Sequence, residues 1–128
     1  MSKLILYLFL LFSIYICEEP KNIRVFDSRK DMGKVIKIRP GEEFKLKLFG
    51  SPSRAPWILL NENEALEYLQ LLKNFDHYEV YLLNVNGIRY YSYFHFKALK
   101  KTKEDLILKF RLNHNKIREE LTFTINVE

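Results

Sequence analysis

Residues 43–48 read Glu-Phe-Lys-Leu-Lys-Leu, so that every second side chain is apolar. Because successive side chains of a strand point to opposite faces of a sheet, this alternation predicts a strand with one buried face. The same period of two recurs in segments that begin at Val35, Tyr78, Phe94, Leu106 and Leu121. A further short strand is expected at residues 23–26. The chain is therefore expected to fold mainly from short strands.

Turn signals separate these strands. Arg39-Pro40-Gly41-Glu42 predicts a tight turn, because proline presets φ and glycine tolerates a positive φ. Asn86-Gly87 favours a hairpin connection. Residues 63–72 carry leucines at helical spacing and predict a short helix of two to three turns. The pattern as a whole predicts an all-β fold, an immunoglobulin-like antiparallel β-sandwich with one short helix.

The N-terminal segment has a different composition. Lys3 precedes an apolar run over residues 4–17, and Glu18-Glu19-Pro20 ends that run. This order is typical of a secretory signal peptide, which we expect at 1–17. The run is shorter than the roughly 20 apolar residues of a membrane-spanning helix. A short uncleaved anchor or a lipid-modified Cys17 is the alternative.

The domain plan and the location follow from that segment. We expect a partly irregular N-terminal segment at 18–33 and one sandwich domain at 34–128. A signal peptide implies a secreted protein or one in an endosomal or lysosomal type of vesicle. No stable membrane span is expected, and the domain is expected to be a monomer.

The mature chain lacks the residues that most kinds of catalytic site require. Cys17 is the only cysteine and lies within the expected signal peptide, so thiol chemistry and cysteine-based zinc sites are excluded. The three histidines do not stand at metal-ligand spacing, and no serine occupies a Gly-x-Ser-x-Gly turn. Four glycines leave no phosphate-binding loop. We therefore expect no enzyme, no metal and no cofactor.

Charged and aromatic residues suggest two candidate binding surfaces, and each of them also has a purely structural explanation. The net charge is +5, and the densest basic cluster spans residues 97–103. A solvated turn between strands is expected there in preference to a nucleic-acid site, so no nucleic-acid partner is expected. Tyr90-Tyr91-Ser92-Tyr93 predicts either cross-strand packing or a surface that binds a partner. Trp57 begins an apolar run and is expected in the core.

The strand and loop pattern resembles the chagasin-like inhibitors of papain-type cysteine peptidases. Residues 41–48 and the proline-containing loop that ends in Trp57 resemble the start of that family. The resemblance continues from Gly87 to the closing strand at 121–127 and covers residues 34–127. It implies an immunoglobulin-like sandwich in which three loops at one end enter the active-site cleft of the peptidase.

Each implied loop departs from the family's pattern. The family's first loop reads Asn-Pro-Thr-Thr-Gly, and here it keeps Pro52 and a hydroxyl at Ser53. The second reads Gly-x-Gly-Gly and keeps only Gly87, while the third, Arg-Pro-Trp or Arg-Pro-Phe, is lost. The implied protease-binding residues are Ser51, Pro52, Ser53, Arg54, Ala55, Pro56, Gly87, Ile88, Arg89, Tyr90, Leu112, Asn113, His114 and Asn115.

Two functions remain open from the sequence. The first is a proteinaceous inhibitor that occludes the cleft of a papain-like cysteine peptidase. The alternative is a non-inhibitory immunoglobulin-like module that binds another secreted or surface protein. Arg89 and Tyr90 add bulk where the family's glycines let the backbone approach closely, whereas Pro52 and Pro56 would stiffen the first loop. Loops that project together would favour inhibition, and an exposed patch of tyrosines would favour the module.

Overall fold

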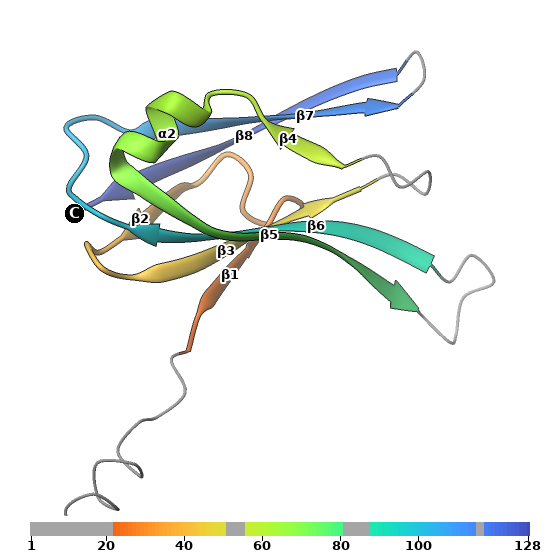
Figure 1. The fold of residues 1–128 in the computed structure, drawn as a ribbon, viewed down its shortest axis with the longest axis horizontal. Helices are drawn as coiled ribbons and strands as arrows, with labels where there is room; N and C mark the ends of the chain where they lie inside the picture. Colours follow the sequence, from red (N-terminus) through yellow and green to blue (C-terminus); the bar gives the residue numbers. More distant parts are fainter. Residues whose placement is uncertain (1–21, 51–55, 81–87, 115–116) are drawn as a thin grey trace, which may run out of the picture.

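The computed structural model describes residues 22–50, 56–80, 88–114 and 117–128, which form two four-stranded sheets packed face to face (Figure 1). The first sheet has the order β1-β3-β6-β5 and the second the order β2-β8-β7-β4. The elements are β1 (Arg24–Asp27), β2 (Val35–Ile38), β3 (Glu43–Phe49), β4 (Trp57–Leu59), α2 (Glu62–Tyr68), β5 (Leu69–Val80), β6 (Ile88–Ala98), β7 (Leu106–His114) and β8 (Ile117–Val127).

The core lies between the sheets and contains the apolar sides of the alternating strands. In β3 the buried side chains are Phe44, Leu46 and Leu48, as the period of two predicted. Phe94 of one sheet packs on Phe110 of the other, with their ring centroids 4.8 Å apart. The predicted alternation is therefore confirmed in β2, β3, β6, β7 and β8, whose apolar faces meet the opposite sheet. The side chains of Tyr78, Val80 and Leu82, where another alternating strand was expected, lie outside the described residues.

The sandwich is the immunoglobulin-like one that the sequence predicted, and most strand pairs are antiparallel, but each sheet also has one parallel pair at its edge. β1 runs parallel to β3, and β2 runs parallel to β8. The reason lies in the order of the chain. After β1 the chain crosses to the other sheet to form β2, and it then returns as β3 in the direction of β1. Parallel neighbours need such a connection outside their own sheet.

The helix is shorter than the sequence predicted. The expected helix at 63–72 ends at Tyr68, and Leu69 has extended dihedral angles, φ −126° and ψ 148°. Leu69 is fully buried and pairs with Ala98 at the start of the β5–β6 ladder. Leu66 and Leu72 are about 40% exposed, so the evenly spaced leucines do not share one buried face. Pairing with the long β6 strand outweighs the local helical spacing.

The turn predicted at Pro40-Gly41 is present. Gly41 has φ +85°, a conformation that glycine adopts without the strain a side chain would cause. Its N–H donates to the carbonyl of Ala98 at 2.7 Å, and the N–H of Glu42 donates to the carbonyl of Arg39 at 3.0 Å. The turn therefore joins β2 to β3 and also contacts the end of β6.

Asn61 extends the edge of the second sheet with its side chain. β4 ends at Leu59, and the N–H of Leu60 still donates to the carbonyl of Lys109. The side-chain oxygen of Asn61 then accepts the N–H of Lys109 at 2.9 Å, while its amide nitrogen donates to the carbonyl of Ile107 at 2.6 Å. The carboxamide thus takes the place of a peptide group of a neighbouring strand.

Replacing Asn61 with alanine is expected to lower the free energy of unfolding by about 1 to 2 kcal/mol, because two hydrogen bonds to β7 are lost. Urea unfolding followed by circular dichroism measures the change. Asn63→Ala is the matched control, because Asn63 is exposed on α2. Equal stability of the two variants would contradict the role assigned to Asn61.

Candidate functional site

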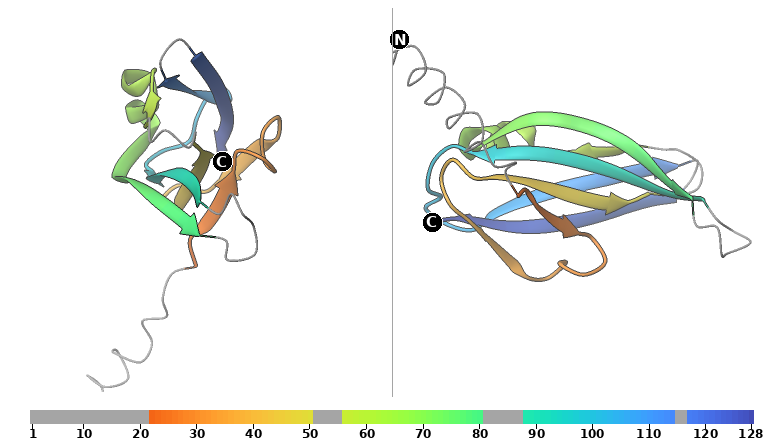
Figure 2. Two further views of the ribbon diagram at one scale, coloured as in Figure 1. Left: turned by 90° about the vertical axis from the view of Figure 1, so that its right-hand side faces the viewer. Right: turned by 90° about the horizontal axis from the view of Figure 1, so that it is seen from below.

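The strand ends that flank the three implied loops lie at the same end of the sandwich. These are the end of β3 and start of β4, the end of β5 and start of β6, and the end of β7 and start of β8. All of them lie on the right in Figure 1, and the view from below in Figure 2 agrees. The opposite end carries the C-terminus and the β2–β3 turn (Figure 1). We call the end with the six strand termini the loop end.

The structure places only some of the implied binding residues. Ser51, Pro52, Ser53, Arg54, Ala55, Gly87 and Asn115 lie outside the described residues. Ile88, Arg89 and Tyr90 begin β6, and Asn113 and His114 end β7, so the strands extend into the second and third implied loops. The side chains of these five residues are also outside the described part. Pro56 is exposed directly before β4.

Leu112 has a structural position and does not contact solvent. Its side chain is 2% exposed and belongs to the core cluster, although the resemblance implied a place in a binding loop. It lies opposite Trp57 in the β4–β7 ladder. Leu112 is therefore a core residue near the end of β7 and not part of an exposed binding loop.

Trp57 ties the two sheets together at the loop end. Its indole is 4% exposed, which confirms the predicted core position. Nε1–H donates to the carbonyl of Phe49 at 3.0 Å, and this bond joins the start of β4 to the end of β3 in the other sheet. The N–H of Phe49 donates to the hydroxyl of the buried Ser28 at 3.0 Å. Both ends of the segment between β3 and β4 are therefore held in place.

The tyrosines at this end do not form an exposed apolar patch among the described residues. Tyr91 is 3% exposed, although it lies outside the core cluster. Its ring meets Phe49 edge to face at 5.6 Å. Tyr93 stacks on Phe75 with centroids 4.9 Å apart. Cross-strand packing is therefore the role of both tyrosines, while the side chain of Tyr90 lies outside the described part.

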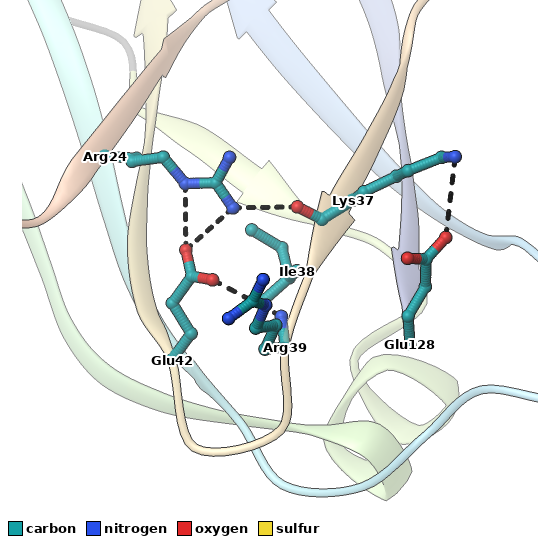
Figure 3. A pocket seen from close by; sticks show the side chains of 6 residues that line it. All are labelled: Arg24, Lys37, Ile38, Arg39, Glu42 and Glu128. Carbon is teal, nitrogen blue, oxygen red and sulfur yellow. Dashed lines mark hydrogen bonds and ion pairs between the residues drawn. The ribbon is translucent and has the colours of Figure 1, made fainter.

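A polar pocket of about 390 Å³ lies near the opposite end, between β1 and β2 (Figure 3). Arg24 bonds to Glu42 through Nε at 2.9 Å and Nη2 at 2.8 Å, and Nη2 also donates to the carbonyl of Lys37 at 2.7 Å. The ammonium of Lys37 lies 3.5 Å from Glu128. These hydrogen bonds and ion pairs form among the residues that line the pocket. They join β1 and β2, the edge strands of the two sheets, so the residues have a structural role.

Within residues 22–50, 56–80, 88–114 and 117–128, no three His, Cys, Asp or Glu side chains are grouped so as to hold a metal ion. None of the helices in that same part of the chain is long and apolar enough to cross a membrane.

Comparison with solved structures agrees with this architecture. One similar structure is the cysteine protease inhibitor EhICP2 from Entamoeba histolytica, with a TM-score of 0.63 and 15% identity over 83% of this chain and 96% of that one. Another is amebosin, with a TM-score of 0.54 and 14% identity over 84% of this chain and all of amebosin. The sandwich that the resemblance to chagasin-like inhibitors implied is confirmed as the fold of this chain.

Sequence comparison adds nothing to this likeness. No model of a known protein family matches the chain, and no curated protein matches its sequence. Of these two neighbours, EhICP2 has a stated activity, that of a cysteine protease inhibitor. At 14% to 15% identity the likeness shows the fold alone.

Proposed function

We propose that the protein inhibits papain-like cysteine peptidases by inserting the loop end into the active-site cleft. The observation that carries this proposal is the gathering of the six strand termini at one end of a sandwich (Figure 1). Segments 50–56, 81–87 and 115–116 leave the sandwich from those termini, and segments so placed would meet a cleft together. The fold shared with the inhibitor EhICP2 supports the same reading.

The support beneath the loop end favours tight binding. Trp57 and Ser28 hold both backbone polar groups of Phe49, and Leu112 is buried in the core near the end of β7. A binding segment whose ends are already fixed loses less conformational entropy when it meets its partner. The proposal includes entry into the secretory pathway through residues 1–17, which would bring the protein to secreted or vesicular peptidases.

Titration of papain and of a cathepsin L-type peptidase with the purified protein tests the proposal. Residual peptidase activity is expected to fall at near-stoichiometric ratios. Gly87→Glu is expected to weaken inhibition by about 100-fold or more, because it adds a charged side chain where the backbone must approach the cleft; such a loss corresponds to about 2.7 kcal/mol.

Lys101→Glu is the control for Gly87→Glu. Lys101 is exposed in the connection between β6 and β7, which lies at the end opposite the loop end (Figure 1). Its charge reversal is larger than the charge added at Gly87, yet inhibition is expected to stay unchanged. A folded wild-type protein that leaves both peptidases fully active at micromolar concentration would refute inhibition and favour the non-inhibitory module.

A further inference from the structure

The outer face of the β1-β3-β6-β5 sheet carries cations that rest on aromatic rings. Lys47 Nζ lies 3.9 Å from the ring centroid of Tyr91, and the guanidinium of Arg29 lies 3.9 Å from that of Phe49. The rings of Phe49 and Tyr91 are themselves in contact at 5.6 Å. These contacts form one end of a continuous row on the solvent side of the sheet.

The row continues across three strands. Lys47 also lies 5.9 Å from the ring of Tyr93, which stacks on Phe75. Lys73 and Lys45 approach the same Phe75 ring, at 5.0 Å and 5.9 Å. We call the cations Arg29, Lys45, Lys47 and Lys73, together with the rings that they contact, the cation–aromatic row.

Two arginines of the other sheet share a carboxylate, whereas two lysines of the row have no such partner among the described residues. On the β2-β8-β7-β4 sheet, Arg118 and Arg111 both bond to Glu120, at 2.8 Å and 3.1 Å. The hydrogen bonds from Arg118, and then from Arg111, hold the pKa of Glu120 below its ordinary value. Within the part of the chain that the structure describes, Lys45 and Lys73 have no carboxylate partner.

Three acidic groups on β1, β3 and the β1–β2 connection have partners outside the row's lysines. One carboxylate oxygen of Asp27 accepts the backbone N–H of Arg29 at 2.8 Å, and a carboxylate oxygen of Asp31 accepts the backbone N–H of Asp27 at 2.8 Å. The carboxylate of Glu43 lies 3.2 Å from the ring nitrogen of His95. Lys45 and Lys73 come from strands on either side of β6 and converge on one ring. Like charges brought together in this way repel, and an anionic oxygen placed between them removes the repulsion.

We propose that the cation–aromatic row binds a sulfated polysaccharide chain along the outer face of this sheet. A chain of sulfate groups supplies anionic oxygens to several ammonium groups at once and needs no deep pocket. Lys45 and Phe49 are separated by about 13 Å along β3, so the row is long enough to meet more than one sulfate. The row begins at the loop end with Phe49 and Tyr91, and Lys45 and Lys73 both lie opposite His95, farther along β6 from that end. The proposal does not depend on protease inhibition.

A single-stranded nucleic acid fits the row less well. Proteins bind such strands by stacking bases on open aromatic faces. In this sheet the cations lie over the rings of Phe49, Tyr91 and Phe75, and Phe75 also stacks on Tyr93. The rings position the charges and are not free to stack with bases.

Binding of heparin oligosaccharide to the purified protein, followed by calorimetry at about 50 mM and 200 mM salt, tests the proposal. The triple variant Arg29→Gln, Lys45→Gln, Lys73→Gln is expected to weaken binding about tenfold or more at the lower salt concentration, and to reduce the dependence on salt. Circular dichroism checks that the variant is folded, and titration of papain checks that any protease inhibition is unchanged.

The matched control removes the same charge from the densest basic stretch of the sequence. Lys100→Gln, Lys101→Gln, Lys103→Gln is expected to change heparin affinity less than about twofold. Equal losses in the two triple variants would show binding to net charge alone and would overturn the proposal. Absence of heparin binding at 50 mM salt would also overturn it, as would tighter binding of single-stranded DNA of equal charge.

Discussion

Replacing Phe110 with alanine is expected to lower the free energy of unfolding by about 3 to 5 kcal/mol. Phe110 is fully buried and lies where the two sheets meet. Its ring contacts Phe94 of the opposite sheet at 4.8 Å and Phe123 of its own sheet at 6.1 Å. Alanine would remove both contacts and leave a cavity between sheets that other strands hold apart. A loss of this size is a large share of the stability of a small domain.

Urea unfolding of Phe110→Ala, followed by circular dichroism, measures this loss. Ile107→Ala is the control on the same strand, because Ile107 is 44% exposed on the outer face. The control is expected to change stability by less than about 1 kcal/mol. Similar unfolding midpoints for the two variants would contradict the packing assigned to Phe110.

Replacing Trp57 with alanine is expected to cost about 3 to 5 kcal/mol of stability, because a large buried ring is lost at the loop end. Trp57→Phe keeps most of that volume and removes the Nε1 bond to the carbonyl of Phe49. This second variant is expected to cost about 1 to 2 kcal/mol. It should also weaken protease inhibition more than its stability loss explains, because the start of β4 is no longer tied to β3.

Ile36→Val serves as the stability-matched control for Trp57→Phe. Ile36 is 4% exposed in the core, and this change typically costs about 0.5 to 1.5 kcal/mol. Unfolding midpoints and inhibition constants are measured for both variants. If Ile36→Val weakened inhibition as much as Trp57→Phe, the bond from Trp57 to Phe49 would have no specific part in positioning the loop end.

The strands were predictable because a strand with one buried face shows an alternation of apolar and polar residues within a short stretch of sequence. In β3, the apolar and basic side chains alternate, and the structure buries Phe44 while Lys45 points to the outer face. The helix was less predictable. Leu66, Leu69 and Leu72 have helical spacing, yet β5 begins at Leu69 because pairing with β6 supplies a longer ladder.

The candidate sites differ in how far sequence could reveal them. The resemblance to chagasin-like inhibitors named three loops, and the strands that lead to them do meet at one end (Figure 1). It also included Leu112, which the structure buries. The cation–aromatic row left only a partial signal, the alternating Lys45 and Lys47 of β3. Its other cations come from the β1–β2 connection and from β5.

The sequence by itself determined which face of each strand is buried, because side-chain alternation is a property of a few neighbouring residues. Only the tertiary structure decided which strands are neighbours, that β1 and β2 pair in parallel, and that Lys45 and Lys73 meet at one ring. Those features depend on contacts between residues far apart in the chain. The period of two is the same whichever strand lies alongside, so it cannot specify the partner.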